Sequence, residues 1–321
     1  MRKRILGLVL AMLPTPVVYG EDGVYLKVAD VPADYAIQGE YSGIIDANQE
    51  KWGAQVIALG DGKYESAGYR LGLPGDGYEP GEEVRRIEFR TENGKVIAAK
   101  DEFTFEIKDK QLHVMDSSGQ PLGKLTKIER VSPSMGSKPP AGAVVLFDGK
   151  NADAFQNGKL SPEGYLQADC TSKEAFGDHF LHLEFLTPFK PKGRGQDRGN
   201  SGVYMQGRYE LQVLDSFGLS GENNECGGIY SIAKPRVNMC YPPLTWQTYD
   251  IEFQSARYDA EGKKIKNARA TILHNGIKIH EDLELKNGTP GKDPEGPGNG
   301  PLYLQGHGNP VVYRNLWVVK R

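Results

Sequence analysis

Strand-like runs separated by turn residues fill the first part of the chain, from residue 21 to about residue 131. Three of these runs reverse at short polar turns, at positions 61–62 (Asp-Gly), 93–94 (Asn-Gly) and 109–110 (Asp-Lys). Asp-Gly and Asn-Gly between apolar segments favour the tight turns of antiparallel hairpins. The pattern therefore predicts a small antiparallel β-meander over residues 21–131.

A stretch rich in proline, serine and glycine at residues 132–142 (SPSMGSKPPAG) has the composition of a linker. Strand-like runs resume after it and continue to the C-terminus. Two long glycine-rich segments, 188–200 and 287–300, interrupt these runs and are expected to be loops. Many strands with long loops predict a β-sandwich over residues 143–321.

Composition agrees with an all-β protein of two domains. The chain has 321 residues, of which 40 are glycine and 20 are proline, and 38% of its residues are hydrophobic. This length suggests two domains, and this glycine and proline content suits turn-rich β-structure better than helices. A net charge of −3 offers no basic face, so no nucleic-acid partner is expected.

The N-terminus has the pattern of a targeting segment. Three basic residues at positions 2–4 precede a short apolar run at 5–13, and Val-Tyr-Gly at 18–20 suits a cleavage site. We therefore expect residues 1–20 to be a signal peptide and the mature protein to be periplasmic or extracellular. The apolar run is too short to span a bilayer, so no stable membrane insertion is expected.

The three cysteines, Cys170, Cys226 and Cys240, lack the C-x-x-C spacing that would suggest zinc. Export permits a disulfide, and Cys226 with Cys240 is the pair that their separation favours. Three unpaired thiols are an equal alternative.

The segment YELQVLDS at residues 209–216 places polar groups along one strand. Alternation puts Glu210 and Gln212 on one face, whereas Asp215 has the wrong parity unless a bulge intervenes. The spacing E-x-Q-x-x-D is similar to the E-x-D-x-x-E strand of laminarinase-type β-glucanases, whose outer carboxylates act as nucleophile and acid/base. Gln212 replaces the middle acid, which disfavours an ordinary glycosidase. A solvated strand face without chemistry is the alternative.

A second polar face is expected near the C-terminus. Tyr303, Gln305 and His307 alternate with leucines and glycines, and Gly-Asn-Pro at 308–310 then reverses the chain. Arg314, on the returning strand of this hairpin, is expected to lie close to His307. Glycines on both sides leave space around the His307 ring, so His307 is a candidate functional residue. The other five histidines are expected to be surface or core residues.

Four strings carry a family resemblance: NSGVY (200–204), YELQVLDS (209–216), GGIY (227–230) and GPLYLQGHGNPVVYRNLW (300–317). Over residues 143–321 the chain resembles the 3-keto-disaccharide hydrolase family. The resemblance implies a concanavalin A-like jelly-roll β-sandwich. It also implies cleavage of glycosides whose C3 hydroxyl has been oxidised to a ketone.

The chemistry that the resemblance implies begins at the ketone, which acidifies the C2 proton. A general base removes this proton while donors stabilise the enolate oxygen, the C1 substituent leaves by β-elimination, and water can add back. His307 or Glu210 is the candidate base. Arg314 and Gln305 are candidates to support the oxyanion. Asp215 could hold a donor or a divalent metal ion, although no ligand spacing in the chain demands one.

The substrate is expected to be an oligosaccharide or another glycoside, with aromatic rings stacking on sugar faces and amides binding hydroxyls. The candidate substrate-binding residues are Asn200, Tyr204, Gln212, Tyr230, Tyr303 and Gln305. Three alternatives stay open: a carbohydrate-binding module without turnover, an ordinary laminarinase-type glycosidase, and a structural or adhesion domain.

Overall fold

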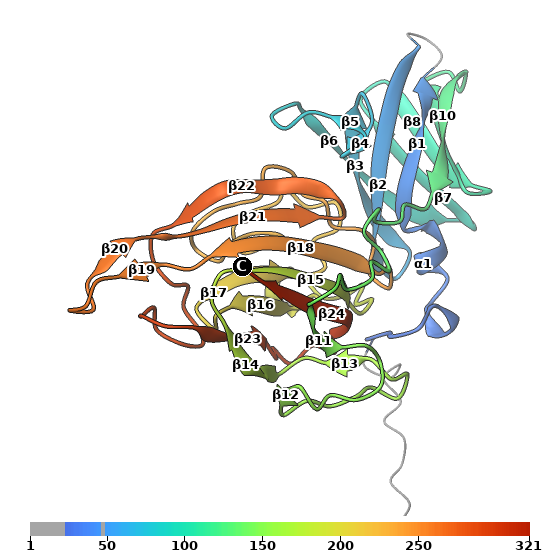
Figure 1. The fold of residues 1–321 in the computed structure, drawn as a ribbon. Coiled ribbons are helices and arrows are strands. Elements are labelled where there is room, and N and C mark those ends of the chain that lie inside the picture. The colour runs from blue at the N-terminus through green and yellow to red at the C-terminus, as the bar shows by residue number, and fades with distance from the viewer. Residues whose placement is uncertain (1–22, 46–48) are drawn as a thin grey trace, which may run out of the picture.

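A computed structural model describes residues 23–45 and 49–321. Within them the chain forms a β-barrel, coloured blue to green, followed by a β-sandwich whose colours run to red (Figure 1). The signal peptide expected at residues 1–20 lies outside the described residues. In the described part of the chain, no helix has the length and apolar character needed to cross a membrane.

Eight antiparallel strands close the barrel, and the first, β1, pairs with the last, β10. In order they are β1 (Gly39–Ile45), β2 (Glu50–Gly60), β3 (Lys63–Arg70), β6 (Val84–Glu92), β7 (Lys95–Lys100), β8 (Phe103–Lys108), β9 (Gln111–Asp116) and β10 (Pro121–Ile128). The short strands β4 (Leu73–Pro74) and β5 (Gly77–Tyr78) form a separate ribbon between β3 and β6. The predicted meander is confirmed, and its two edges join, which removes exposed strand edges.

The predicted hairpin turns are also confirmed. Asp61, Asn93 and Asp109 have positive φ angles of 55°, 49° and 49°. Short β-turns of this kind need that backbone conformation, which Asn and Asp tolerate better than most residues.

One end of the barrel is closed. The short helix α1 (Asp34–Ile37) lies there, and the Tyr41 hydroxyl donates a hydrogen bond of 2.6 Å to the Ile37 carbonyl. Phe189, from the sandwich, packs into the same apolar cluster as Tyr41 and is fully buried. The 3₁₀ turn η1 (Val28–Asp30) precedes this helix.

The sandwich consists of two antiparallel sheets. The larger sheet contains β11 (Val144–Phe147), β24 (Val312–Lys320), β15 (His179–Leu186), β18 (Gln247–Gln254), β21 (Ala268–His274) and β22 (Ile277–Leu285), with β13 (Leu166–Gln167) beside β24. The smaller sheet contains β12 (Phe155–Gln156), β14 (Cys170–Phe176), β23 (Gly300–Leu304), β16 (Ser201–Met205) and β17 (Tyr209–Val213). A two-stranded ribbon, β19 (Arg257–Tyr258) with β20 (Lys264–Lys266), and the 3₁₀ turn η2 (Gly195–Asp197) complete it.

Apolar side chains from the facing sides of the two sheets form one large core. Leu183 of β15, Val203 of β16 and Ile251 of β18 are fully buried in it. Alternation in each strand turns the intervening side chains outward, so each sheet also has an outer face. The predicted all-β architecture, a sandwich preceded by a meander, is confirmed.

The segment expected to be a linker is partly attached to the outer face of the larger sheet. The hydroxyl groups of Ser132 and Thr248 lie 2.6 Å apart, and the Ser134 hydroxyl donates to an Asp250 carboxylate oxygen at 2.6 Å. The Gly136 N–H donates to Glu184 Oε1 at 2.7 Å. Only residues 138–142 are exposed throughout, so the freely accessible part of this segment is shorter than its composition suggests.

Contacts also join the barrel directly to the sandwich. The Arg86 guanidinium donates to the Gly218 carbonyl at 2.6 Å, and the Tyr35 hydroxyl donates to the Pro243 carbonyl at 2.9 Å. Ile57 of β2 packs into the apolar core of the sandwich. The barrel is therefore fixed against the sandwich by polar and apolar contacts.

The structure holds Cys170, Cys226 and Cys240 as buried free thiols. Cys226 Sγ lies 3.2 Å from the Tyr249 hydroxyl. Of the two cysteine alternatives, the structure therefore shows unpaired thiols.

Candidate active site

The outer face of the smaller sheet is polar. Strand pairing aligns Gly202 with Gln212 and Tyr204 with Glu210 across β16 and β17, and it aligns Tyr204 with Tyr303 of β23. Residues opposite one another in an antiparallel pair share a face. The structure therefore brings these polar side chains together on one face, from strands about 100 residues apart in the sequence.

Two glycines make room for the carboxylate at the centre of this face. A Cβ atom at Gly202 would lie 2.5 Å from Glu210 Oε1. A Cβ atom at Gly291, where φ is +131°, would lie 2.4 Å from the Tyr204 hydroxyl. Real Cβ contacts are longer, so a side chain at either position would displace the Glu210–Tyr204 pair.

Glu210 is almost fully buried, with 4% of its surface exposed. The Tyr204 hydroxyl donates to Glu210 Oε2 at 2.8 Å, and Gln305 Nε2 donates to the Tyr204 oxygen at 3.1 Å. Burial raises the pKa of Glu210 to about 7, although the hydrogen bond from Tyr204 opposes this shift. A carboxyl group with this pKa can take up and release a proton near neutral pH, which suits a general base or acid.

Tyr204 remains a hydrogen-bond donor beside this carboxylate. Burial and the nearby Glu210 charge raise the pKa of Tyr204 well above its usual range. Thr289, from the loop at 287–300, accepts a hydrogen bond of 2.8 Å from the Glu210 backbone N–H. The position of Glu210 therefore depends on both its strand and this loop.

Three amide side chains extend the polar face. Asn200 Nδ2 donates to Gln196 Oε1 at 2.9 Å, and Gln212 Nε2 donates to the Asn224 carbonyl at 3.3 Å. The buried oxygens Asn200 Oδ1, Gln212 Oε1 and Gln305 Oε1 receive no hydrogen bond from any residue that the structure describes. Buried acceptors need donors, so these oxygens are available to the hydroxyl or amide groups of a bound ligand.

Aromatic rings and a cation border the face. The Tyr303 ring lies 5.3 Å from the Tyr204 ring, and Lys292 Nζ lies 4.6 Å from the centre of the Tyr303 ring. The Tyr303 hydroxyl donates to Asp169 at 3.2 Å. Tyr230 is half-buried, and its backbone N–H donates to the Glu210 carbonyl at 3.1 Å. The face thus combines a central carboxylate, amides, aromatic rings and an ammonium group.

The model of the family described as "3-keto-alpha-glucoside-1,2-lyase-like domain" matches residues 142–319. The chain belongs to this family. The matched residues contain the two sheets of the sandwich, whereas the barrel lies outside them. The family resemblance predicted from short strings is therefore confirmed.

A solved structure agrees with the family. A Parabacteroides distasonis protein named "putative glycosyl hydrolase" is 28% identical, covers 57% of this chain and 85% of its own, and has a TM-score of 0.52. A second protein of that name and organism is 20% identical, covers 56% of this chain and 99% of its own, and has a TM-score of 0.40. A third is 15% identical, covers 56% of this chain and 94% of its own, and has a TM-score of 0.42. No curated protein matches. Family and neighbour together indicate a glycoside-cleaving enzyme that acts on carbohydrates.

Arg314 was predicted to share a face with Glu210, and this position was wrong. It lies on β24 in the larger sheet, where its Nε donates to Glu184 at 2.6 Å and its guanidinium lies over the Trp246 ring. The chain does reverse near residues 308–310, but it crosses from the smaller sheet to the larger one. The expected C-terminal hairpin between β23 and β24 is therefore absent from the described sheets.

Asp215 and His307 both lie beyond the ends of their strands, β17 and β23. Asp215 is buried and ion-paired with Arg198, whose Nε lies 2.7 Å from Asp215 Oδ2. His307 is exposed in the loop after β23, beyond the end of the strand at Leu304. Among the described residues, no side chain forms a hydrogen bond with the His307 ring. Alternation along β23 therefore did not extend as far as His307.

The described residues do not form a metal site here. No three His, Cys, Asp or Glu side chains among them gather as ligands. Asp215, the carboxylate considered for a metal, receives hydrogen bonds from Arg198 and from the Phe217 backbone N–H. Both carboxylate oxygens of Asp215 are therefore already engaged as hydrogen-bond acceptors.

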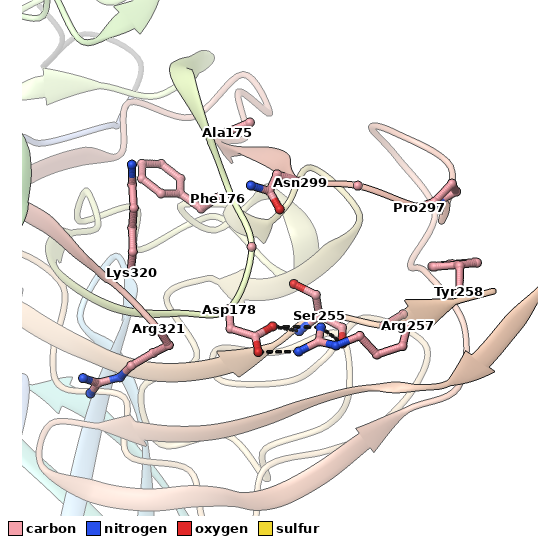
Figure 2. A pocket seen from close by; sticks show the side chains of 13 residues that line it. Ala175, Phe176, Asp178, Ser255, Arg257, Tyr258, Pro297, Asn299, Lys320 and Arg321 are labelled. Atoms are coloured by element: carbon pink, nitrogen blue, oxygen red, sulfur yellow. Dashed lines mark hydrogen bonds and ion pairs between the residues drawn. The ribbon is translucent and has the colours of Figure 1, made fainter. Parts of the chain in front are cut away.

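A separate cavity of 500 Å³ lies where β14, β18 and β24 end (Figure 2). Figure 2 shows Asp178 hydrogen-bonded to Arg257, with Ser255 beside them. Lys320 and Arg321, also at this cavity, form ion pairs with Glu174 and Glu252. The cavity contains none of the candidate active-site residues, and its cations are already paired.

Sequence reasoning missed several residues of the candidate site. Gln196, Thr289 and Lys292 all come from the two long glycine-rich segments. Those segments have no alternating pattern, so the sequence predicted them only as loops. The length of these segments and their position between strands were the signals that could have marked them as functional loops.

Proposed function

We propose that this enzyme cleaves 3-keto-glycosides by removing the C2 proton and eliminating the C1 substituent. The observation that supports this best is the buried carboxyl group of Glu210, whose pKa is raised to about 7. A base of that strength suits removal of a proton made acidic by an adjacent ketone. Family membership supports the same substrate class.

The proposed reaction has two steps. Glu210 takes the C2 proton, and the electron pair of the C2–H bond forms the enolate at C3. The enolate then re-forms the ketone, a C1=C2 double bond appears, and the C1–O bond to the leaving group breaks. The departing oxygen takes a proton from protonated Glu210 or from water. Addition of water across the double bond would complete net hydrolysis.

Lys292 is the proposed stabiliser of the enolate oxygen. Its ammonium lies over the Tyr303 ring, and the preceding residue, Gly291, closely approaches the Tyr204 hydroxyl. A fixed cation lowers the energy of the anion formed in the first step. In this proposal Gln305 keeps Tyr204 in place, and Arg314 has no part in the reaction because it lies on the other sheet.

Sugar binding is assigned to the amides and aromatic rings of the same face. The buried oxygens of Asn200, Gln212 and Gln305 would accept hydrogen bonds from hydroxyl groups. The rings of Tyr303 and Tyr230 would border the sugar, as aromatic groups commonly do in carbohydrate sites. Gln212 adds no second negative charge near Glu210, unlike the middle acid of the laminarinase pattern.

An ordinary glycosidase finds less support in this geometry. Such enzymes use two carboxyl groups on either side of the scissile bond. The second acid that the E-x-Q-x-x-D spacing suggests, Asp215, is buried against Arg198. A carbohydrate-binding module would use the same face without turnover, and it gives no reason for the raised pKa of Glu210. Release of the aglycone from a 3-keto-glucoside by the purified protein would distinguish the enzyme from the module.

We expect the rate to depend on pH through Glu210. The proposed base must be ionised, and its pKa is about 7. The value of kcat/KM on a 3-keto-glucoside should therefore fall about tenfold per pH unit well below pH 7 and level off above it. Initial rates at low substrate concentration between pH 5 and pH 9 would measure this. A flat profile across this range would argue against Glu210 as the base.

Export is a further part of the proposal. It rests on the basic and apolar pattern of residues 1–20. N-terminal sequencing of protein recovered from outside the cytoplasm of the producing cell should give a chain that begins near Glu21. An N-terminus at Met1 would contradict it.

A further inference from the structure

The open half of the barrel interior is a cavity of 240 Å³. Its lining comes from seven of the eight barrel strands, β7 being the exception, so it lies inside the barrel rather than on its surface. The principal apolar groups are those of Trp52, Ile87, Phe103, Phe105, Leu112 and Val114. An eight-stranded barrel has an interior of the size that either fills with side chains or holds one small ligand.

The inward-facing residues of β3 explain why only one half is open. Tyr64, Ser66 and Gly68 follow one another along the inner side of β3. The inward side chains therefore become smaller along the strand, from a phenol ring at Tyr64 to no side chain at Gly68. Tyr64 packs with Phe89 and Tyr41 in the filled half, next to α1. Ala54, opposite Gly68 on β2, adds only a methyl group to the open half.

One cation stands at this cavity without a carboxylate partner. The Arg85 guanidinium lies 5.0 Å from the centre of the Trp52 ring and is exposed. Among the described residues, no carboxylate lies within ion-pair distance of it. The other two arginines of β6 are paired, Arg86 with Glu65 and Arg90 with Glu92. Arg85 is therefore available to an external anion.

We infer that the barrel binds a small amphiphilic carboxylate. Its apolar chain would enter the cavity between Trp52, Phe103 and Leu112, and its carboxylate would meet the Arg85 guanidinium. Arginine is well suited to carboxylates because its planar donors match both oxygens. The volume lies below the roughly 300–1,000 Å³ typical of pockets for drug-sized ligands, which favours a chain of about eight carbons over a long-chain lipid. This binding site is independent of the proposed reaction at Glu210.

Isothermal titration of the mature chain with octanoate tests this inference. We expect binding with a dissociation constant on the order of 10⁻⁴ M, as suits a ligand of this size. Octan-1-ol, which has the same chain without the charge, should bind about tenfold more weakly. Arg85→Gln should weaken octanoate binding about tenfold and leave octan-1-ol binding unchanged. Arg90→Gln, on the same strand and already paired, is the matched control and should bind octanoate normally.

A second variant tests whether the apolar chain of the ligand lies inside the barrel. Ala54→Leu fills part of the cavity and should prevent binding of both octanoate and octan-1-ol, with a melting curve recorded to confirm folding. Arg85→Gln alters an exposed residue and keeps the test valid if Ala54→Leu does not fold. Absence of octanoate binding would overturn the inference. Equal affinity for octanoate and octan-1-ol, or unchanged octanoate affinity in Arg85→Gln, would overturn it as well.

Discussion

Glu210→Gln should lower kcat on a 3-keto-glucoside by about 10²–10⁴-fold, the usual contribution of a general base. Glutamine keeps the shape of glutamate and can still accept the hydrogen bond from Tyr204. Substrate binding should therefore change little, and the loss should appear in kcat rather than KM. Steady-state kinetics of the purified variant would measure both values.

Glu284→Gln is the matched control, because Glu284 is an exposed carboxylate on the larger sheet. Its carboxylate accepts a hydrogen bond from Asn267. This variant should retain full activity. Wild-type activity in Glu210→Gln would show that another group removes the proton, and His307→Ala would then be the next variant to measure.

The same variant should differ from the wild type in stability. Burial raises the pKa of Glu210 from 4.5 to about 7. The folded state therefore holds this proton more tightly than the unfolded state, and ionisation destabilises the folded state as pH rises from about 4.5 to about 7. The full penalty, present above pH 7, is at most on the order of 3 kcal/mol. Glu210→Gln should melt at a higher temperature than the wild type at pH 8 and at a similar one at pH 4.

Gly202→Ala should lower kcat/KM by roughly 10²-fold, the loss that a displacement of about 1 Å can cause. The added methyl group would lie 2.5 Å from Glu210 Oε1, so the carboxylate must move. The fold should survive, because the methyl group points to the outer face rather than into the core. Activity and a melting curve for the purified variant would separate these effects.

Gly296→Ala is the control for that substitution. Gly296 lies on the loop beside the site, and a Cβ atom there would meet nothing within 4 Å. It should leave kcat/KM unchanged. Normal kcat/KM in Gly202→Ala would show that the position of Glu210 is not critical for catalysis.

Much of the fold could be predicted because its signals are local. The turns at 61–62, 93–94 and 109–110 fixed the hairpins of the meander. Closure of the barrel could not be predicted, since it depends on pairing between β1 and β10, about 80 residues apart, with no pattern that marks them as partners. The attachment of Ser132 and Ser134 to the larger sheet could not be predicted either, because their hydrogen bonds join residues 116 positions apart in the sequence.

The candidate site divides in the same way. Strand alternation correctly placed Glu210 with Gln212, because both lie on the regular strand β17. It also placed Gln305 on the face of Tyr303, where Gln305 bonds Tyr204. It failed for Arg314, because alternation cannot tell a hairpin from a crossing between sheets. Gln196 and Lys292, in irregular loops, gave no periodic signal.

Hydrolysis rates on a 3-keto-glucoside and on its unoxidised parent glucoside, measured with one preparation under the same conditions, test the central claim most directly. The proposed mechanism requires the C3 ketone, because without it the C2 proton is not acidic enough for Glu210 to remove. We therefore expect release of the aglycone from the 3-keto-glucoside and no measurable release from the parent. Comparable rates on the two substrates would contradict the elimination mechanism.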